Sequence, residues 1–275
     1  MRVFLLTFYF ESTDNLHVSI VRSRSAYESS LTRFLVPVFF YPCNVIAELK
    51  KANLEAEIIF VDDNSRDGSV EKVAEMKAAG YNVSIIVRTT ERGLSSAVLA
   101  GFAAAKNEVL VCMDADLQHD PVYLPSLVAP VFSGAADFCV GSRNVDGGAV
   151  KDWPVHRKLI SWAATLMARP LVACSDPMSG FFALRRTTLA RKTKVNAMGF
   201  KIGLELMVRC GCARIQEVPI VFRDREQGDS KLTMKQNIYY VMQLAQLYVE
   251  TKPQLVVAAV VAALLVLYFL YKALF

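Results

Sequence analysis

Apolar runs alternate with helix-like segments through the first half of the chain. Glu57–Asp62, Val83–Val87 and Glu108–Met113 are short runs rich in Val, Ile and other apolar residues, which is typical of buried strands. Between them, Asp67–Gly80 begins with capping residues and ends in glycine, and Leu94–Ala105 is rich in alanine, so both are predicted helices. This order predicts an α/β fold with a mostly parallel central sheet and flanking helices, of the Rossmann-like kind.

Three further elements are predicted in the second half of the chain. Asp137–Gly141 is strand-like, and Gln236–Glu250 has the spacing of an amphipathic helix. Lys151–Val172 is a long helical candidate that contains both tryptophans of the chain. Packing in the core is the favoured interpretation of this helix, because its apolar face is wide but not strongly basic. A shallow position on a membrane surface is the alternative.

The C-terminus is the most apolar part of the chain. Leu255–Tyr271 is an uninterrupted apolar run with Lys252 and Lys272 on either side. A run that is apolar on every face, and close to the length of a membrane span, is better explained as a transmembrane anchor than as a buried core helix. We therefore predict three parts: a domain over residues 1–235, a juxtamembrane helix over 236–254 and a membrane anchor over 255–275.

Composition narrows the classes of function. The 275 residues carry a formal net charge of +5 without any polybasic run, which argues against nucleic acid as a partner. Basic residues are instead scattered between Arg143 and Lys231, as suits an anionic ligand. The six cysteines have neither the spacing of a zinc site nor that of a disulfide framework, so we expect a reducing, cytosolic environment.

Two carboxylates stand directly after the predicted strand that ends at Met113. Asp114 and Asp116 share one side of an extended chain, and Gln118 adds an amide oxygen. Hard oxygen donors of this kind suit Mg²⁺ or Mn²⁺, which complete their coordination with substrate phosphates. The pattern therefore favours metal-assisted handling of a diphosphate. His119 is close enough to support such ligands, although no histidine is assigned to catalysis.

A second polar segment, Val61-Asp-Asp63, also falls at the carboxyl end of a predicted strand. Ligands of open α/β sheets bind at this edge. The chain contains no G-x-G-x-x-G or Walker sequence, so a dinucleotide fold or a P-loop is not favoured. Asp67 is better explained as a helix cap than as a ligand.

Further motifs complete the pattern between Ala56 and about Glu250. They are Val61-Asp-Asp-Asn-Ser-Arg-Asp-Gly-Ser69, Arg88 with Gly93-Leu-Ser95, Met113-Asp-Ala-Asp-Leu-Gln118, Gly141-Ser-Arg143, His156-Arg-Lys158, Met178-Ser-Gly-Phe-Phe182, Gly199-Phe-Lys-Ile202, Glu217-Val-Pro-Ile220 and Arg225-Glu-Gln-Gly-Asp-Ser-Lys-Leu232. With this combination, the chain resembles the family 2 glycosyltransferases of the GT-A fold. Among these, it resembles the enzymes that make dolichyl-phosphate mannose.

The resemblance implies an enzyme that transfers mannose from GDP-mannose to dolichyl phosphate with inversion, using Mg²⁺ or Mn²⁺. The acceptor phosphate has its second pKa at about 6, so it is largely dianionic and needs no strong protein base. A single-pass protein of the endoplasmic reticulum membrane is implied, with its catalytic domain facing the cytosol and no required accessory subunit. The alternatives are a dolichyl-phosphate glucosyltransferase that uses UDP-glucose, and an inactive, membrane-anchored subunit that binds a nucleotide sugar.

The same resemblance assigns roles to individual positions. Residues matched to nucleotide-sugar binding are Tyr27, Glu28, Val61, Asp63, Asp114, Ala115, Asp116, Arg143, Lys201, Arg225 and Lys231. Residues matched to the acceptor phosphate are Arg143, Arg157 and Ser161, and the metal would be held by Asp114, Asp116 and Gln118. The candidate catalytic residues are Asp116, Arg143, Arg157 and Arg225, and the polar segment 225–231 is interpreted as a lid.

The chain departs from the family near its N-terminus. Family members follow their first strand with a Pro-x-Tyr-Asn-Glu turn that grips the nucleotide base. Here Val18–Val21 is the candidate first strand, Ser25 replaces the proline and Glu28 stands at the asparagine position. The sequence of this segment therefore does not predict whether the chain selects guanine or uracil. Met1–Phe10 is apolar but lacks a small-residue cleavage site, so we do not interpret it as a signal peptide.

Overall fold

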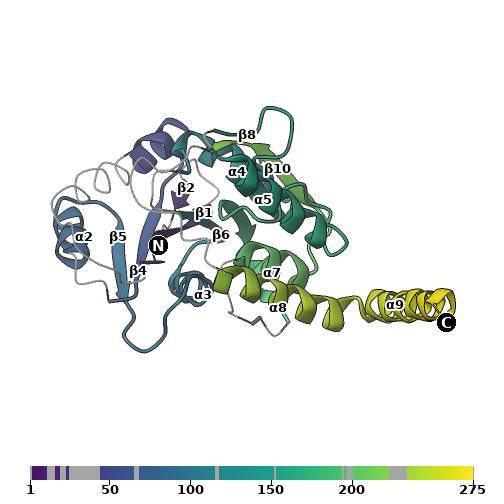
Figure 1. Ribbon diagram of the computed structural model, residues 1–275. Coiled ribbons are helices and arrows are strands. Elements are labelled where there is room, and N and C mark those ends of the chain that lie inside the picture. Colours follow the sequence, from purple (N-terminus) through teal and green to yellow (C-terminus); the bar gives the residue numbers. More distant parts are fainter. Residues whose placement is uncertain are drawn as a thin grey trace.

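A mixed β-sheet with helices on both faces forms the body of the molecule (Figure 1). The computed structural model describes residues 2–10, 16–18, 23–24, 44–64, 68–114, 118–151, 153–193, 195–196, 201–222 and 234–274. Over these residues the main sheet has the strand order β10-β7-β9-β6-β1-β4-β5, with β2 and β3 paired to β1. The strands are β1 (Arg2–Phe10), β2 (Leu16–Val18), β3 (Ser23–Arg24), β4 (Glu57–Asp62), β5 (Val83–Val87), β6 (Val109–Asp114), β7 (Phe138–Ser142), β9 (Phe182–Arg185) and β10 (Ile215–Pro219).

Most long strands of this sheet point the same way. β4 is parallel to β5 and β10 is parallel to β7. β4 and β6 are both antiparallel to β1, and β6 and β7 are both antiparallel to β9, so β5, β4, β6, β7 and β10 share one direction. The prediction of a mostly parallel sheet is confirmed in this sense, with β1 and β9 as reversed strands. The carboxyl ends of β4, β6 and β7 therefore meet at the same edge.

The central strand β1 was not predicted. Its register places Leu5 opposite Ile59 of β4 and opposite Cys112 of β6. Of the predicted first strand, Val18–Val21, only Val18 lies within the described residues, where it belongs to the short strand β2 beside β1. An apolar run is compatible with a strand, a signal peptide or a core helix, and only its long-range pairing decides among these.

The helices cover the sheet on both sides and form two cores. They are the helical residues 44–51, then α2 (Ser69–Ala78), α3 (Leu94–Ala104), η1 (Pro121–Tyr123), α4 (Leu124–Phe132), α5 (Val155–Ala168), α6 (Arg186–Ala190), α7 (Ile202–Arg209), α8 (Met234–Thr251) and α9 (Pro253–Leu274). Ile58 and Phe60 of β4 pack in the core with residues 44–51, α2 and α4, whereas Ile59 and Val61 pack in the core with α3, α7 and α8. Alternate residues of a strand face opposite sides, so a strand buried on both faces is apolar throughout.

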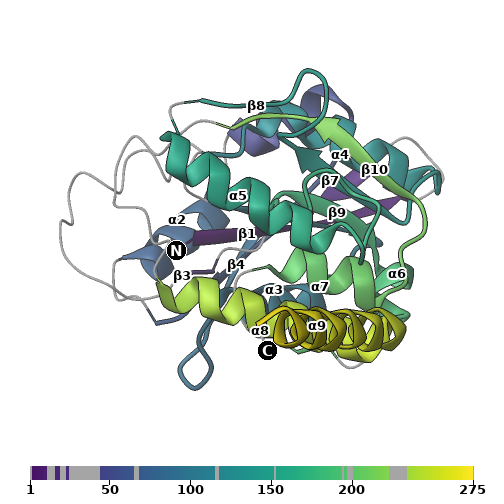
Figure 2. The ribbon, with the colours of Figure 1, turned by 45° about the vertical axis from the view of Figure 1, so that its right-hand side comes forward.

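The predicted helix Lys151–Val172 is shorter in the structure and lies differently. It begins at Val155 after the extended Pro154 and ends at Ala168, with Arg169 as its C-cap and Pro170 directly after. The predicted core packing is wrong: Thr165 and Ala168 are buried, but most of the large apolar side chains of α5 are exposed. Figure 2 shows α5 crossing the front of the domain above α8.

The last helix, α9, extends beyond the domain (Figure 1). It follows α8 after Lys252, begins at Pro253, and is long and apolar enough to cross a membrane, judged by length and composition. The domain covers none of its apolar stretch Pro253–Leu270. The expectation of one apolar helix at the C-terminal end of the chain is confirmed.

Candidate active site

The ligand-type side chains gather at the edge where the strands of common direction end. Asp63 follows β4, Asp114 is the last residue of β6, and Arg143 follows β7. The loop between α5 and β9 brings Asp176 to the same place. A site at this edge is expected for an open α/β sheet, because loops leaving the carboxyl ends of neighbouring strands lie side by side.

Asp114 presents a carboxylate at this edge, with its side chain 24% exposed. The main-chain N–H of Asp114 donates to Nδ1 of His119 over 3.0 Å. Gly180 leaves room for the carboxylate: a Cβ added there would come within 3.3 Å of Oδ2 of Asp114. Gln118, the amide of the predicted metal set, is buried. No cluster of three acidic, histidine or cysteine ligands is found over the described residues, which do not include Asp116.

His119 is held neutral behind Asp114. Its ring stacks on Phe181 at 4.9 Å between ring centroids and is almost fully buried. Burial, with the nearby charge of Arg143, lowers the pKa of His119 to about 3, against the opposing effect of Asp176. Since Nδ1 accepts a hydrogen bond, the proton of the neutral ring resides on Nε2. His119 therefore orients the main chain of Asp114 and does not exchange protons near neutral pH.

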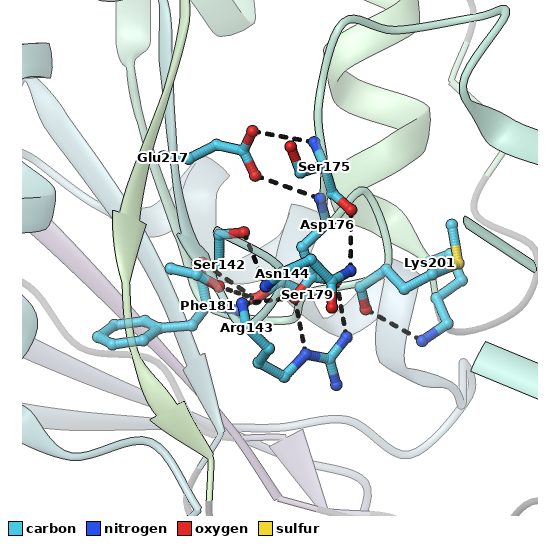
Figure 3. Close-up of polar contacts among 11 residues, drawn as sticks. Ser142, Arg143, Asn144, Ser175, Asp176, Ser179, Phe181, Lys201 and Glu217 are labelled. Carbon is cyan, nitrogen blue, oxygen red and sulfur yellow. Dashed lines mark hydrogen bonds and ion pairs between the residues drawn. The ribbon is translucent and has the colours of Figure 1, made fainter. Parts of the chain in front are cut away.

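Arg143 is fixed by a buried carboxylate that the sequence did not single out. Nε and Nη2 of Arg143 donate to the two carboxylate oxygens of Asp176, each over 2.7 Å, and the main-chain N–H of Arg143 donates over 2.9 Å (Figure 3). Burial would raise the pKa of Asp176, but the attraction and hydrogen bonds of Arg143 outweigh this and lower it. The pair is therefore ionised, and the planar guanidinium has one orientation.

The loop that carries Asp176 is held by a second carboxylate. Glu217 of β10 accepts hydrogen bonds from the main-chain N–H groups of Ser175, over 2.9 Å, and of Asp176, over 3.2 Å (Figure 3). Asn144 donates from Nδ2 to the carbonyl of Ser175 over 2.8 Å. Glu217 therefore fixes Asp176, which in turn fixes Arg143. Glu217 stands in one of the motifs quoted above, but its sequence position gave no sign of this partner.

An aromatic group lies beside Arg143 at the start of α5. The guanidinium carbon of Arg157 lies 3.9 Å from the ring centroid of Trp153, and that of Arg143 lies 5.4 Å from the same centroid. Phe222 of the short strand β11 (Val221–Phe222), which pairs with β8 (Ala149–Val150), meets Trp153 edge-on at 5.9 Å. Ser161 lies one helical turn beyond Arg157 on α5 and is also half-buried. The three residues predicted to bind an acceptor phosphate, Arg143, Arg157 and Ser161, thus come from adjoining elements.

Lys201, the half-buried N-cap residue of α7, adds a cation to the site. Its Nζ donates to the carbonyl of Met178 over 3.1 Å, in the loop that also holds Asp176 (Figure 3). Burial, followed by repulsion from Arg143, lowers the pKa of Lys201 to about 8, although Asp176 and Asp114 oppose the shift. Lys201 therefore belongs to the same electrostatic environment as Arg143 and Asp114.

The predicted nucleotide side of the site is more closed. Asp63 is completely buried: Oδ1 accepts from Nε of Arg88 over 2.8 Å and from Nη2, and Oδ2 accepts from the N–H of Gly93 over 2.9 Å. The side chain of Val61 lies in the core, so only its main chain is available to a ligand. Nucleotide contacts at Asp63 and Val61 remain predictions.

Several predicted site residues lie outside the described residues. They are Tyr27, Glu28, Ala115, Asp116, Arg225 and Lys231. The structure instead adds residues that sequence reasoning missed, chiefly Asp176, Glu217 and the ring of Trp153. The one available signal was a lone aspartate in the otherwise small and apolar segment from Ala173 to Gly180. A buried carboxylate of that kind requires a cationic partner.

Comparison with known proteins identifies the family to which this chain belongs. Residues 43–191 match the glycosyl transferase family 2. The fold agrees with that of glucosyl-3-phosphoglycerate synthase from Mycobacterium tuberculosis, crystallised with Mn²⁺, UDP-glucose and phosphoglyceric acid. That similarity has a TM-score of 0.57 at 20% identity and covers 85% of this chain and 78% of that one. The chain therefore belongs to glycosyl transferase family 2.

Within the family, the chain is similar to enzymes of one named activity. It is 52% identical over 203 residues to the dolichol-phosphate mannosyltransferase of Saccharomyces cerevisiae, which covers 71% of this chain and 75% of that protein. It is 50% identical over 196 residues to the dolichol-phosphate mannosyltransferase of Mycosarcoma maydis, which covers 70% of this chain and 66% of that protein. The resemblance inferred from the motifs is confirmed.

Proposed function

We propose that this protein transfers mannose from GDP-mannose to dolichyl phosphate, giving dolichyl β-D-mannosyl phosphate. The observation that carries the proposal is the meeting of Arg143, Arg157, Lys201 and Asp114 at one sheet edge, in a chain about half identical to dolichol-phosphate mannosyltransferases. Cations on both sides of an acidic strand end suit two phosphate groups, one on the donor and one on the acceptor.

The proposed chemistry is a single displacement with inversion at the anomeric carbon. An oxygen of the dianionic acceptor phosphate attacks, the bond between the sugar and the diphosphate breaks, and GDP leaves. Arg143 and Arg157 orient the acceptor phosphate, and Lys201 balances charge on the departing diphosphate. His119 is buried and neutral, and its Nδ1 accepts from the main-chain N–H of Asp114, so we do not assign it as a base. The nucleophilicity of the acceptor phosphate is supplied by its own charge.

A divalent ion, Mg²⁺ or Mn²⁺, fits the donor set. Asp114 and Gln118 supply hard oxygen ligands, and the glycine at position 180 keeps the space beside the Asp114 carboxylate open. Asp116 is the third proposed ligand. Such an ion would act as a Lewis acid that neutralises the charge on the diphosphate. The M. tuberculosis neighbour was crystallised with Mn²⁺, which supports a divalent ion of this type.

We further propose a single-pass anchor in the endoplasmic reticulum membrane, with the domain of residues 1–235 on the cytosolic side. α9 supplies the span, and a short span suits a thin bilayer. α5 and α8 touch through the hydroxyls of Tyr240 and Tyr248, which donate to carbonyls of α5. Both helices expose apolar side chains, among them Val155, Leu159, Trp162, Ile238 and Val241. These surfaces suit a domain that rests on the bilayer, near a lipid-borne acceptor.

The decisive assay uses the full chain in detergent with dolichyl phosphate. Transfer from radiolabelled GDP-mannose is compared with transfer from UDP-glucose, each with Mn²⁺, Mg²⁺ or excess EDTA. We expect mannose transfer that EDTA abolishes and that Asp116→Ala reduces at least about a hundredfold, as for loss of a metal ligand. Asp120→Ala is the matched control, because Asp120 is an exposed cap of η1 only four residues further on. Preferred transfer of glucose, or full activity in EDTA, would refute the donor or the metal.

The anchor is tested by deleting residues 255–275. We expect the truncated chain to leave the membrane fraction on carbonate washing, while the domain keeps its melting temperature because none of the described side chains along Pro253–Leu270 is buried. Membrane association that survives the deletion would assign the anchoring role to the apolar faces of α5 and α8 instead.

A further inference from the structure

Trp153 lies close to both arginines proposed to bind the acceptor phosphate. Its ring is 3.9 Å from the guanidinium carbon of Arg157 and 5.4 Å from that of Arg143, measured to the ring centroid. Both contacts are within the range at which a cation is attracted to the electron-rich face of an indole. Two like charges are thus held near one aromatic group, and Phe222 packs edge-on against that group at 5.9 Å.

The indole N–H of Trp153 has no use within the described part of the protein. Nε1 is buried, and no described residue accepts a hydrogen bond from it. A buried donor without an acceptor destabilises a protein, so such groups are rare unless a ligand or a water completes them. Indole nitrogen is a donor only, so its missing partner is an acceptor such as a phosphate oxygen.

One donor of the Arg143 guanidinium is not used by its ion pair with Asp176. Asp176 takes Nε and Nη2, whereas Nη1 has no hydrogen-bond partner among the residues that the structure describes. Within the part of the chain that the structure describes, Arg143 and Trp153 therefore each have a donor without an acceptor, and Arg157 adds positive charge. A tetrahedral dianion with several acceptor oxygens matches this set better than a sugar hydroxyl or a nucleobase does.

The acceptor phosphate is favoured over the donor diphosphate by the surroundings. Trp153 lies two residues before α5, on which Ser161 is half-buried and the apolar residues Leu159 and Trp162 are exposed. Lys201 and Asp114, the groups proposed for the diphosphate, lie at the loop of Met178 and Gly180, which also holds Arg143 through Asp176, whereas Trp153 and Arg157 lie at the start of α5. A lipid-borne phosphate that approaches along the exposed apolar face of α5 would reach the end of the helix at which Trp153 and Arg157 lie.

We infer that Trp153 is a recognition residue for the polyprenyl phosphate. Its N–H donates to a phosphate oxygen, and its ring holds the guanidinium of Arg157 in place for the same phosphate. The inference rests on the proposed function, which supplies a phosphate on a lipid as the acceptor. Trp153 adds a neutral hydrogen-bond donor to the cations Arg143 and Arg157. A donor at a fixed position would favour a phosphate monoester that binds at one depth in the site.

The kinetic test compares Trp153→Phe, which keeps an aromatic face but lacks the N–H, with Trp153→Leu, which lacks both. We expect the KM for dolichyl phosphate to rise about tenfold in the Phe variant and about a hundredfold in the Leu variant. The KM for the nucleotide sugar should stay within about twofold, and kcat of the Phe variant within about threefold. An unchanged acceptor KM in Trp153→Phe, or an equal rise in both KM values, would overturn the inference.

A binding test does not depend on turnover. The chain has two tryptophans, so Trp162→Phe leaves Trp153 as the single indole. Its emission is followed in detergent while farnesyl phosphate is added, with farnesol as the matched lipid that lacks the phosphate. A saturable change with the phosphate alone supports the inference, and an equal response to both lipids, or none to either, overturns it. If the wild-type chain transfers no mannose but this titration succeeds, the proposed reaction fails while the phosphate site at Trp153 stands.

Discussion

Two buried arginine–carboxylate pairs stand at the same sheet edge and are used differently. Asp63 and Asp176 are both fully buried, and the side chains of Arg88 and Arg143 are 8% and 9% exposed. All three nitrogens of the Arg88 guanidinium have protein partners: Nη1 donates to Ser96 over 2.8 Å, Nη2 to Asp63 and to the carbonyl of Gly93, and Nε to Asp63. Nη1 of Arg143 has none within the described ranges.

Burial alone therefore does not identify a functional arginine. The two pairs have nearly equal exposure, but the pair at β4 is closed by the loop at Gly93, whereas the pair at β7 opens toward Trp153 and Lys201. A guanidinium whose nitrogens all donate to protein groups stabilises the fold. A guanidinium that is held in one orientation but keeps an unused donor can bind an anion. We expect substitutions at the two sites to separate stability from activity.

The largest expected effect is on activity in Arg143→Lys. A lysine is a point charge and cannot keep the bidentate contact with Asp176 while presenting a further donor, so kcat/KM should fall at least about a hundredfold. Transfer assays and thermal melting on the same preparation check this. Arg214→Lys is the matched control, since Arg214 pairs with Asp137 through a side chain that is 60% exposed. Activity within threefold of wild type would show that the open donors are not used.

Arg88→Lys should instead act on stability. Lysine has fewer donors, so the hydrogen bonds from Arg88 to the carbonyl of Gly93 and to the hydroxyl of Ser96 are lost and the contact with Asp63 is weakened. Among the described residues, only the bond from Ser96 to the Gly93 carbonyl, and that from the N–H of Ala97, remain there. The free energy of unfolding should fall by about 2 kcal/mol, as expected for a disrupted buried network. Chemical denaturation measures this loss, and kcat well below the melting temperature should change less than in Arg143→Lys. A larger loss of kcat than of stability would erase the contrast between the two pairs.

The smallest expected effect is a pH dependence from Lys201. Burial, then Arg143, lowers its pKa to about 8 from the ordinary 10.5, so the cation is lost as pH rises through about 8. The kcat/KM for the nucleotide sugar should fall about tenfold per pH unit above that value, and Lys201→Arg should remove the fall because its charge persists.

Stability should respond to Lys201 in the opposite direction. Between pH about 8 and 10.5 the unfolded chain keeps the proton that the folded chain has released, so the unfolded state binds more protons and stability rises with pH. Comparison with Lys201→Met isolates this contribution from that of other groups. Activity and relative stability that fall together above pH 8 would contradict the assignment.

Local sequence patterns were sufficient to predict most helices and strands of the domain. Val83–Val87 is a strand with the predicted bounds, Leu94–Ala105 is shortened by one residue, and the predicted core positions Cys112 and Cys139 are buried. Strand and helix periodicities are properties of neighbouring residues, so one sequence carries them. The exposed face of α5 was missed because burial depends on what packs opposite, which periodicity does not specify.

The candidate active site also has residues that local sequence predicts and partners that it does not. Polar residues at the ends of apolar runs were sufficient to select Asp63 and Asp114, because strand direction alone brings such ends to one edge. Arg143 was selected by the resemblance of Gly141-Ser-Arg143 to the family. The hydrogen-bond partners in the site could not be predicted in this way. Asp176 is 33 positions from Arg143, and Glu217 is 41 positions from Asp176. Charge and spacing allow many pairings across such separations, and the right one depends on which loops the sheet order brings together.

The amino-acid sequence by itself determined the family, the alternation of strands and helices, and the apolar C-terminal helix, since each is encoded in contiguous residues. Tertiary structure alone decided that Arg2–Phe10 occupies the centre of the sheet, that α5 turns its apolar side chains outward, and that Arg143 is held by Asp176 beside Trp153. Such outcomes depend on contacts between distant segments, whose free energies are settled only when the whole chain packs.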